Sequence, residues 1–252
     1  MPSTRTRTSA IPARGFLASP LDITSEIDLT GSCHLTDAVS DEWLNAVREY
    51  VDTIPAGVHE VMLEGAAANK LPFMRQLTSN PDLLALLESV AQTVHPAGDP
   101  AQRDVECALR VLNGADPVNH PLWFHYDASV LTMVLPIDIP DAAPGQSGEL
   151  IVCPNRRPYR RWALTNVIEK AVTQSDRYRR HFLRRLNWHH DIEMVPLQPG
   201  TAYLFWGYRS YHATMPVADG ARRVTVVLHY KDVHPQSRVL KYAKTFYHRL
   251  RG

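Results

Sequence analysis

The feature that most constrains the fold is a change in sequence character near residue 105. From there on, short runs of β-branched and aromatic residues alternate with segments containing Pro and Gly, which is typical of strands joined by turns. The chain has nineteen prolines against twelve glycines, which favours turns and sheet edges over a helical bundle. We therefore expect a mainly β core in this part. The predicted strands are 107–112, 130–139, 149–153, 201–206 and 224–230.

The part of the chain before residue 105 has helical signals instead. Ser40 precedes an amphipathic stretch, and Asn80 precedes another that begins with Pro, so both are predicted N-caps. We predict that residues 37–104 are mostly helical and support the β core. Residues 1–36 are predicted to form a basic arm with one short strand. The expected class is α+β with N-terminal supporting helices.

A helical pattern at 156–185 interrupts the strand-rich part. We predict a basic helical insertion over about 156–190, within one domain that spans 1–252 and has its core in 105–252. Residues 156–185 contain ten Lys or Arg and two acidic residues, a net charge of +8. Because the whole chain has a net charge of +1, the remainder carries −7. The insertion is either a solvated helical face or a docking surface for an anionic substrate, an acidic carrier or RNA.

Composition excludes several other classes. The hydrophobic content of 44% is that of a globular protein rather than a disordered one. Cys33, Cys107 and Cys153 are odd in number and far apart, which predicts buried thiols rather than disulfides or a zinc site. No apolar run approaches the roughly 20 residues of a membrane span, and the N-terminus lacks the apolar stretch of a secretory signal. We expect a cytoplasmic protein without a membrane partner.

The segment 123–127 carries the sharpest chemical signal. His125 and Asp127 are two residues apart, so on an extended segment their side chains point to the same side. An imidazole and a carboxylate supply two of the three ligands in a 2-His-1-carboxylate site for non-haem Fe(II). We predict that His212, which follows the strand 201–206, is the third ligand.

A second His-x-Asp occurs at His189 and Asp191, and chain distance ranks the two. Asp191 is 21 residues from His212, which leaves room for about one strand of typical length. Asp127 is 85 residues from His212, which leaves room for several strands and the insertion. The pair of His125 and Asp127 is therefore the better candidate.

Two arginines begin the last predicted strand. An Arg side chain binds a carboxylate through two parallel hydrogen bonds, which Lys cannot do. Arg222 and Arg223 are consecutive, so only one of them faces the metal ligands. Thr225 lies on the same face as Arg223 and offers a hydroxyl to the same carboxylate. The sequence leaves the choice between the two arginines open.

Together these segments resemble the Fe(II)/2-oxoglutarate-dependent dioxygenases, in their prolyl-hydroxylase-like and phytanoyl-CoA-hydroxylase-like branches. The similarity covers about residues 105–232. It is carried by Leu109-Arg110-Val111-Leu112, His125-Tyr126-Asp127, Gly148-Glu149-Leu150, Pro199-Gly200, and the stretch from His212 through Pro216 to Arg223. The resemblance implies a double-stranded β-helix, a cupin-like jelly roll. It also implies iron bound by His125, Asp127 and His212.

The resemblance further implies that Arg222 or Arg223, with Thr225, binds the distal carboxylate of 2-oxoglutarate. O₂ is the other cosubstrate, and ascorbate is a candidate reductant. The family's Arg-x-Ser is replaced here by Arg223-Val224-Thr225. Halogenating relatives lack the carboxylate ligand, so Asp127 favours hydroxylation, desaturation or a related oxidation.

We expect oxidation of an unactivated C–H bond in a small or carrier-bound, anionic metabolite. Arg110, Trp123, Tyr126 and Trp206 are candidate substrate contacts; Arg110 alternatively pairs with a sheet neighbour. One alternative is hydroxylation of a protein or tRNA residue, which the basic insertion favours, although the insertion has few interleaved aromatic residues for nucleic acid. Another is a cupin-like binding module without catalysis.

Overall fold

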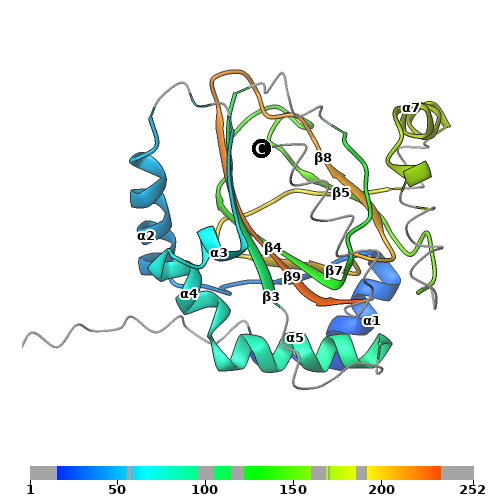
Figure 1. Cartoon of the computed structure of the whole chain (residues 1–252), viewed down its shortest axis with the longest axis horizontal. Coiled ribbons are helices and arrows are strands. Elements are labelled where there is room, and N and C mark those ends of the chain that lie inside the picture. Colours follow the sequence, from blue (N-terminus) through cyan, green and yellow to red (C-terminus); the bar gives the residue numbers. More distant parts are fainter. Residues whose placement is uncertain are drawn as a thin grey trace, which may run out of the picture.

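The structure is a computed structural model and describes residues 16–55, 58, 60–95, 105–114, 122–159, 169, 171–185 and 192–233. Helices and strands alternate irregularly along the chain (Figure 1). The helices are α1 (Pro20–Thr30), α2 (Asp41–Asp52), α3 (Gly65–Ala68), α4 (Pro72–Thr78), α5 (Pro81–Val94) and α7 (Asp176–Arg185). The strands are β1 (Cys33–Leu35), β2 (Glu60–Glu64), β3 (Val105–Asn113), β4 (Ser129–Asp138), β5 (Leu150–Cys153), β6 (Glu193–Val195), β7 (Ala202–Phe205), β8 (Tyr211–Thr214) and β9 (Arg222–Asp232).

The strands form two antiparallel sheets, which confirms the predicted α+β class with a mainly β core. The large sheet has the order β1-β7-β4-β9-β3-β2, and the small sheet has the order β6-β5-β8. Among the described strands, no ladder of hydrogen bonds joins the two sheets. Isolated bridges at His125–His212 and Ser147–Val217 tie further segments to the small sheet and its C-terminal extension. All five predicted strands are present, as β3, β4, β5, β7 and β9.

Both predicted helix starts are confirmed by their capping hydrogen bonds. The Ser40 hydroxyl accepts from the Trp43 N–H at 3.2 Å, and the Asn80 side chain accepts from the Leu83 N–H at 2.9 Å. These bonds satisfy backbone donors that have no partner within the helix. The prediction of helical support before the β core therefore holds for α2 and α5.

The prediction of an arm with one short strand over residues 1–36 is wrong for residues 20–30, which form α1; residues 1–15 lie outside the described residues. Ser19 caps α1, and its first residue is Pro20. Ile23 and Ile27 are buried, and α1 packs against α5. The apolar stripe is only these two residues wide, and exposed leucines elsewhere on the helix obscure its period. The predicted short strand is β1.

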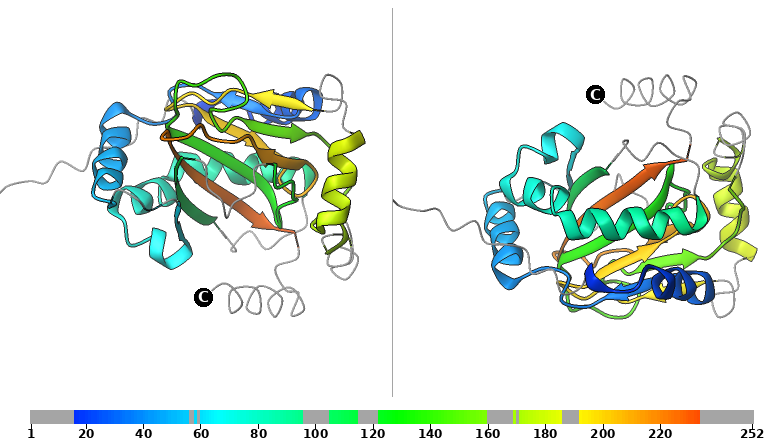
Figure 2. Two further views of the ribbon diagram at one scale, coloured as in Figure 1. Left: turned by 90° about the horizontal axis from the view of Figure 1, so that it is seen from above. Right: turned by 90° about the horizontal axis from the view of Figure 1, so that it is seen from below.

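The two faces of the large sheet have different partners. Alternate residues of β9, namely Val224, Val226 and Leu228, join the core that packs against the N-terminal helices. The other residues of the strand, from Arg223 to His229, face the opposite side, because side chains alternate along a strand. Figure 2 shows the helices covering one side of this sheet while the small sheet lies on the other. We call the side of the large sheet that faces the small sheet its inner face, and polar side chains gather on it.

Within the predicted insertion, residues 176–185 form helix α7, which lies against the outer face of the small sheet (Figure 1), whereas residues 156–159 are not helical. Phe182 of α7 packs on Phe124 and Tyr211, with ring centroids 5.1 and 5.0 Å apart. The Tyr211 hydroxyl donates to the Thr173 carbonyl at 2.6 Å. Insertion and sheet therefore share one small core. In the described part of the chain, no helix has the length and apolarity needed to cross a membrane.

Candidate metal centre

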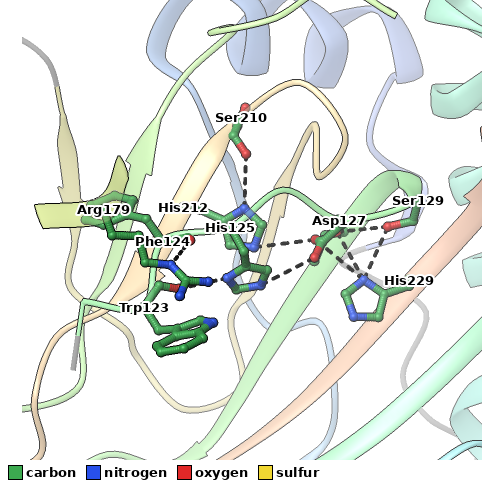
Figure 3. Close-up of polar contacts among 10 residues, drawn as sticks. Trp123, Phe124, His125, Asp127, Ser129, Arg179, Ser210, His212 and His229 are labelled. Atoms are coloured by element: carbon green, nitrogen blue, oxygen red, sulfur yellow. Dashed lines mark hydrogen bonds and ion pairs between the residues drawn. The ribbon is translucent and has the colours of Figure 1, made fainter. Parts of the chain in front are cut away.

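The structure brings His125, Asp127 and His212 together between the sheets (Figure 3). One ligand atom from each lies within 4.8 Å of the others. The His125 Nε2 is 3.6 Å from Asp127 Oδ1, and the His212 Nε2 is 3.5 Å from Asp127 Oδ2. These are the spacings of donors arranged around one ion rather than of direct hydrogen bonds. Two imidazole nitrogens and one carboxylate fit Fe(II) as a facial set of three.

Backbone pairing fixes the two histidines opposite each other. The His125 N–H donates to the His212 carbonyl at 2.9 Å, and the His212 N–H donates to the His125 carbonyl at 3.0 Å. This exchange of both bonds is that of a directly opposed antiparallel pair, whose side chains lie on one side. The imidazole centroids are 4.3 Å apart. A single backbone bridge thus brings together two histidines that are 87 residues apart in the sequence.

The other ring nitrogen of each histidine contacts a main-chain carbonyl. His125 Nδ1 lies 3.0 Å from the Trp123 oxygen, and His212 Nδ1 lies 3.1 Å from the Ser210 oxygen. Because a carbonyl only accepts hydrogen bonds, each Nδ1 carries the proton. Each Nε2 then presents its lone pair on the side of Asp127. Such outer partners fix the tautomer and orientation of histidines that bind metals.

Asp127 is 8% exposed and is held as a carboxylate. Burial opposes its ionisation, but the nearby His212, His229 and His125 and the Thr132 hydroxyl outweigh that effect and hold the pKa of Asp127 below its ordinary value. Thr132 Oγ1 donates to Asp127 Oδ2 at 2.5 Å. The charged form is the one that binds a cation.

Gly207 leaves the space that this arrangement needs. A Cβ at Gly207 would lie 2.2 Å from Thr132 Oγ1 and 2.7 Å from Asp127 Oδ2. The Gly207 carbonyl also accepts from the Asp127 N–H at 3.0 Å. The backbone after β7 therefore both holds Asp127 and limits the residue type beside it to glycine.

His229 is a site residue that the sequence reasoning missed. Its Nδ1 lies 3.6 Å from Asp127 Oδ2 and 3.2 Å from the Ser129 hydroxyl. Among twelve histidines it has no motif around it. The available signal was alternation, since His229 is six residues from Arg223 on one strand and so lies on the same face.

The two candidate arginines lie in different environments. Arg222 is half-buried and forms ion pairs with Asp52 at 2.6 Å and with Asp138 at 2.9 Å. These bonds, the Asp52 one most strongly, raise its pKa. Its charge is therefore already matched by two carboxylates on the outside of the sheet.

Arg223 is 3% exposed and lies on the inner face with Thr225. Its Nε donates to the Gly148 carbonyl at 2.9 Å, and its Nη1 donates to Thr225 Oγ1 at 3.2 Å. Burial lowers the pKa of Arg223 to about 9, with Arg110 adding to that effect and Glu149 opposing it, so the guanidinium stays charged at neutral pH. Within the described residues no carboxylate forms an ion pair with it. A buried cation without a counter-ion favours binding of an anion.

The four predicted substrate contacts are spread over different surfaces. Arg110 lies opposite Thr225 in the sheet register and pairs with Glu60 at 2.9 Å. The exposed Trp123 packs against the Arg179 guanidinium, whose Cζ is 3.4 Å from the ring centroid. The other two lie away from the inner face. Tyr126 belongs to the core under α7, and Trp206 belongs to the core beneath the helices, where it donates to Asp28 at 2.8 Å.

The competing pair of His189 and Asp191 lies outside the described residues. Among the basic residues of the insertion that the structure describes, Arg157 and Arg179 are buried. Arg157 stands between the Tyr126 and Tyr208 rings, 4.0 and 3.9 Å from their centroids. Arg179 donates from Nε to the Phe124 carbonyl at 3.0 Å, as Figure 3 shows. These two side chains hold the segment of His125 and Asp127 against the insertion.

No protein-family model matches the sequence, and no curated protein does. Solved structures do match. A prolyl 4-hydroxylase from Phytophthora capsici is 16% identical, with a TM-score of 0.53 over 87% of this chain and 64% of the other, so this chain spans under two thirds of that protein. HygX from Streptomyces hygroscopicus, solved with nickel and 2-oxoglutarate, is 11% identical, with a TM-score of 0.56 over 85% and 88% of the two chains. SnoN, a non-haem α-ketoglutarate-dependent epimerase from nogalamycin biosynthesis, is 14% identical, with a TM-score of 0.54 over 84% and 80%.

At these identities the likeness establishes the fold. Across most of its length the chain has the fold of the Fe(II)/2-oxoglutarate-dependent oxygenases. Its His-Asp-His triad stands between two antiparallel sheets in that fold. Fold and metal-ligand set together match this class of oxidoreductase.

Proposed function

We propose that this chain is a non-haem Fe(II)- and 2-oxoglutarate-dependent oxygenase that oxidises an unactivated C–H bond of a small or carrier-bound, anionic metabolite. The observation that carries the proposal is the triad. His125, Asp127 and His212 present three oriented donor atoms within 4.8 Å. A binding module without catalysis has no need of this complete set, which argues against the cupin-like alternative.

In this proposal the Nε2 atoms of His125 and His212 and the Asp127 carboxylate would hold Fe(II). With 2-oxoglutarate and O₂, the bound metal supplies the oxidation, in which one oxygen atom goes to the substrate and the other to succinate as CO₂ is lost. Thr132 and Gly207 hold the carboxylate in place, and two main-chain carbonyls hold the imidazoles. The Phe205 ring, centred 4.8 Å from the His212 ring, helps to exclude water.

Arg223 and Thr225 are the proposed site for the distal carboxylate of 2-oxoglutarate. Both are buried, and they lie on the same face of β9 as His229, which is beside Asp127. The strand thus runs from the anion site to the metal site. Val227 lies between them on that face and offers an apolar surface to the methylene groups of the diacid.

Two observations support the substrate class. SnoN and SnoK, both among the structural matches, come from nogalamycin biosynthesis, which favours a small metabolite over a protein or tRNA residue. Arg110 lies on the inner face, and its side chain is 25% exposed. Although Arg110 is paired with Glu60, it is a cation in reach of an anionic substrate near the cosubstrate site.

The test is succinate formation from 2-oxoglutarate with Fe(II), in the wild type and in Asp127→Ala. We expect turnover in the wild type, even without substrate at a low uncoupled rate, and loss of it in the variant. Calorimetric titration with Fe(II) under anaerobic conditions should show a metal site that Asp127→Ala weakens. Absence of both ferrous binding and succinate in the wild type would refute the proposal.

Arg222 and Arg223 provide a matched pair for the cosubstrate site. Arg223→Ala should raise the KM for 2-oxoglutarate at least about tenfold, because a bidentate charge-assisted contact is lost. Arg222→Ala removes the same charge from the outside of the sheet and should leave that KM nearly unchanged. Equal effects of the two variants would contradict the assignment of Arg223.

A further inference from the structure

The solvent-facing side of α7 is a continuous row of basic residues. These residues lie at helical spacings of three and four, so they form one stripe along the helix. All of them are exposed, whereas Arg179 and Phe182 of the same helix are buried. The members of this basic stripe are Arg177, Arg180, His181, Arg184 and Arg185.

The charges of the basic stripe are not matched within the described part of the molecule. No described carboxylate forms an ion pair with any of its four arginines. The exposed Asp176 carboxylate pairs at 3.8 Å with the buried Arg179, and Arg180 donates to the Asp176 carbonyl rather than to its carboxylate. The stripe differs in this from Arg110, Arg209 and Arg222, each of which has a carboxylate partner.

Helix stability does not explain the stripe. Like charges three and four residues apart destabilise a helix by a few tenths of a kcal/mol per pair. Arg184 and Arg185 favourably contact the C-terminal end of the helix dipole, but Arg177 lies near the N-terminus, where a cation is unfavourable. A row of like charges that destabilises its own helix is easier to explain if an external anionic group binds it.

We propose that the basic stripe of α7 docks the acidic helix of a partner protein that delivers the substrate. The stripe runs from Arg177 to Arg185, nine residues and about 12 Å along the helix axis, which complements a single helix with a row of carboxylates. The stripe contains no aromatic residue for base stacking, and the chain outside residues 156–185 carries −7, which repels a long polyanion such as RNA.

The position of α7 connects this surface with the metal centre. The buried side of the helix holds the segment 123–127 through the bond from Arg179 to the Phe124 carbonyl and through Phe182. A partner on the exposed side is thus about one helix diameter, roughly 10 Å, from the segment that carries His125. Trp123, which is 40% exposed, is the first residue of this segment and offers an apolar contact to a tethered substrate. The delivery role rests on the proposed function, whereas docking itself does not.

The experiment measures binding of an apo acyl carrier protein, used as a small acidic helical probe, by fluorescence anisotropy at two salt concentrations. The wild type should bind, and binding should weaken as salt rises. Arg180→Glu with Arg184→Glu should weaken binding at least about tenfold, because attraction is replaced by repulsion. Lys70→Glu with Arg75→Glu is the control, since it changes the net charge equally on exposed residues of another surface and should have little effect.

Each other outcome overturns the proposal. Salt-independent binding, equal loss in both double variants, or no binding of the acidic probe would each refute docking through α7. Tighter binding of a single-stranded RNA or of phosphatidylserine vesicles, lost in the same α7 variant, would replace the protein partner by that ligand. Succinate formation without substrate should be unchanged in the α7 variant, so failure of docking is distinguishable from failure of the oxygenase proposal.

Discussion

Gly148→Ala tests the anion site without substituting any of the residues proposed to contact the anion. Gly148 has φ of +71°, and a Cβ there would lie 2.3 Å from Cδ and 2.7 Å from Nε of Arg223. The left-handed backbone costs an alanine roughly 1–2 kcal/mol. Arg223 must also move and lose its bond to the Gly148 carbonyl, and a hydrogen bond from a charged group contributes about 1.5–3 kcal/mol.

Gly220→Ala separates the two costs. Gly220 has φ of +72°, but nothing lies within 4 Å of its added Cβ. The free energy of unfolding, measured with urea, should fall in Gly220→Ala by the backbone cost alone. In Gly148→Ala it should fall by about 1.5–3 kcal/mol more. Only Gly148→Ala should raise the KM for 2-oxoglutarate, by about tenfold or more. If the two variants lose equal stability and bind 2-oxoglutarate alike, Arg223 does not depend on Gly148 and the reasoning fails.

Three further outcomes follow from the same structure. Gly207→Ala should weaken ferrous binding about 10- to 100-fold in anaerobic calorimetry, because its Cβ displaces Asp127; unchanged affinity would contradict the crowding. Arg179→Lys should weaken ferrous binding about tenfold despite retaining the charge, because Lys loses the Nε bond to Phe124; a variant that only melts earlier would show a purely structural role. Burial raises the pKa of Glu193, so above that pKa the folded state bears a cost that Glu193→Gln removes. Glu193→Gln should be more stable than the wild type near pH 8, and this difference in the free energy of unfolding should shrink as the pH falls through the raised pKa. Urea unfolding at about pH 8 and 5 measures the difference, and a difference that grows as the pH falls would contradict the reasoning.

The strand and helix predictions succeeded where a local pattern carries the information. Ser40 and Asn80 cap helices because a short polar side chain satisfies the N–H groups three residues ahead, which requires no distant partner. The β-branched runs of β4 and β9 are long enough to be recognised alone. The strand β8 was missed because it is four residues long and depends on its pairing with β5. Helix α1 was missed because only two of its residues face the core.

The candidate site divides in the same way. The spacing of His125 and Asp127, and that of Arg223, Thr225 and His229, follow from the two-residue period of a strand, so the sequence by itself determined which of these side chains share a face. It could not determine which face points inward, because that depends on the helices that cover the other side of the large sheet. Nor could it show that α7 holds the ligand segment through Arg179.

The sequence alone therefore determined the chemistry of the donor groups and their local spacing, since both are properties of neighbouring residues. The tertiary structure alone decided that Arg223 lies inside while Arg222 pairs with Asp52 and Asp138 outside. It alone placed His229 of β9 beside Asp127, because that contact joins residues about a hundred positions apart in the sequence. The physical reason is that strand pairing and burial are set by groups distant along the chain, whose packing no local pattern contains.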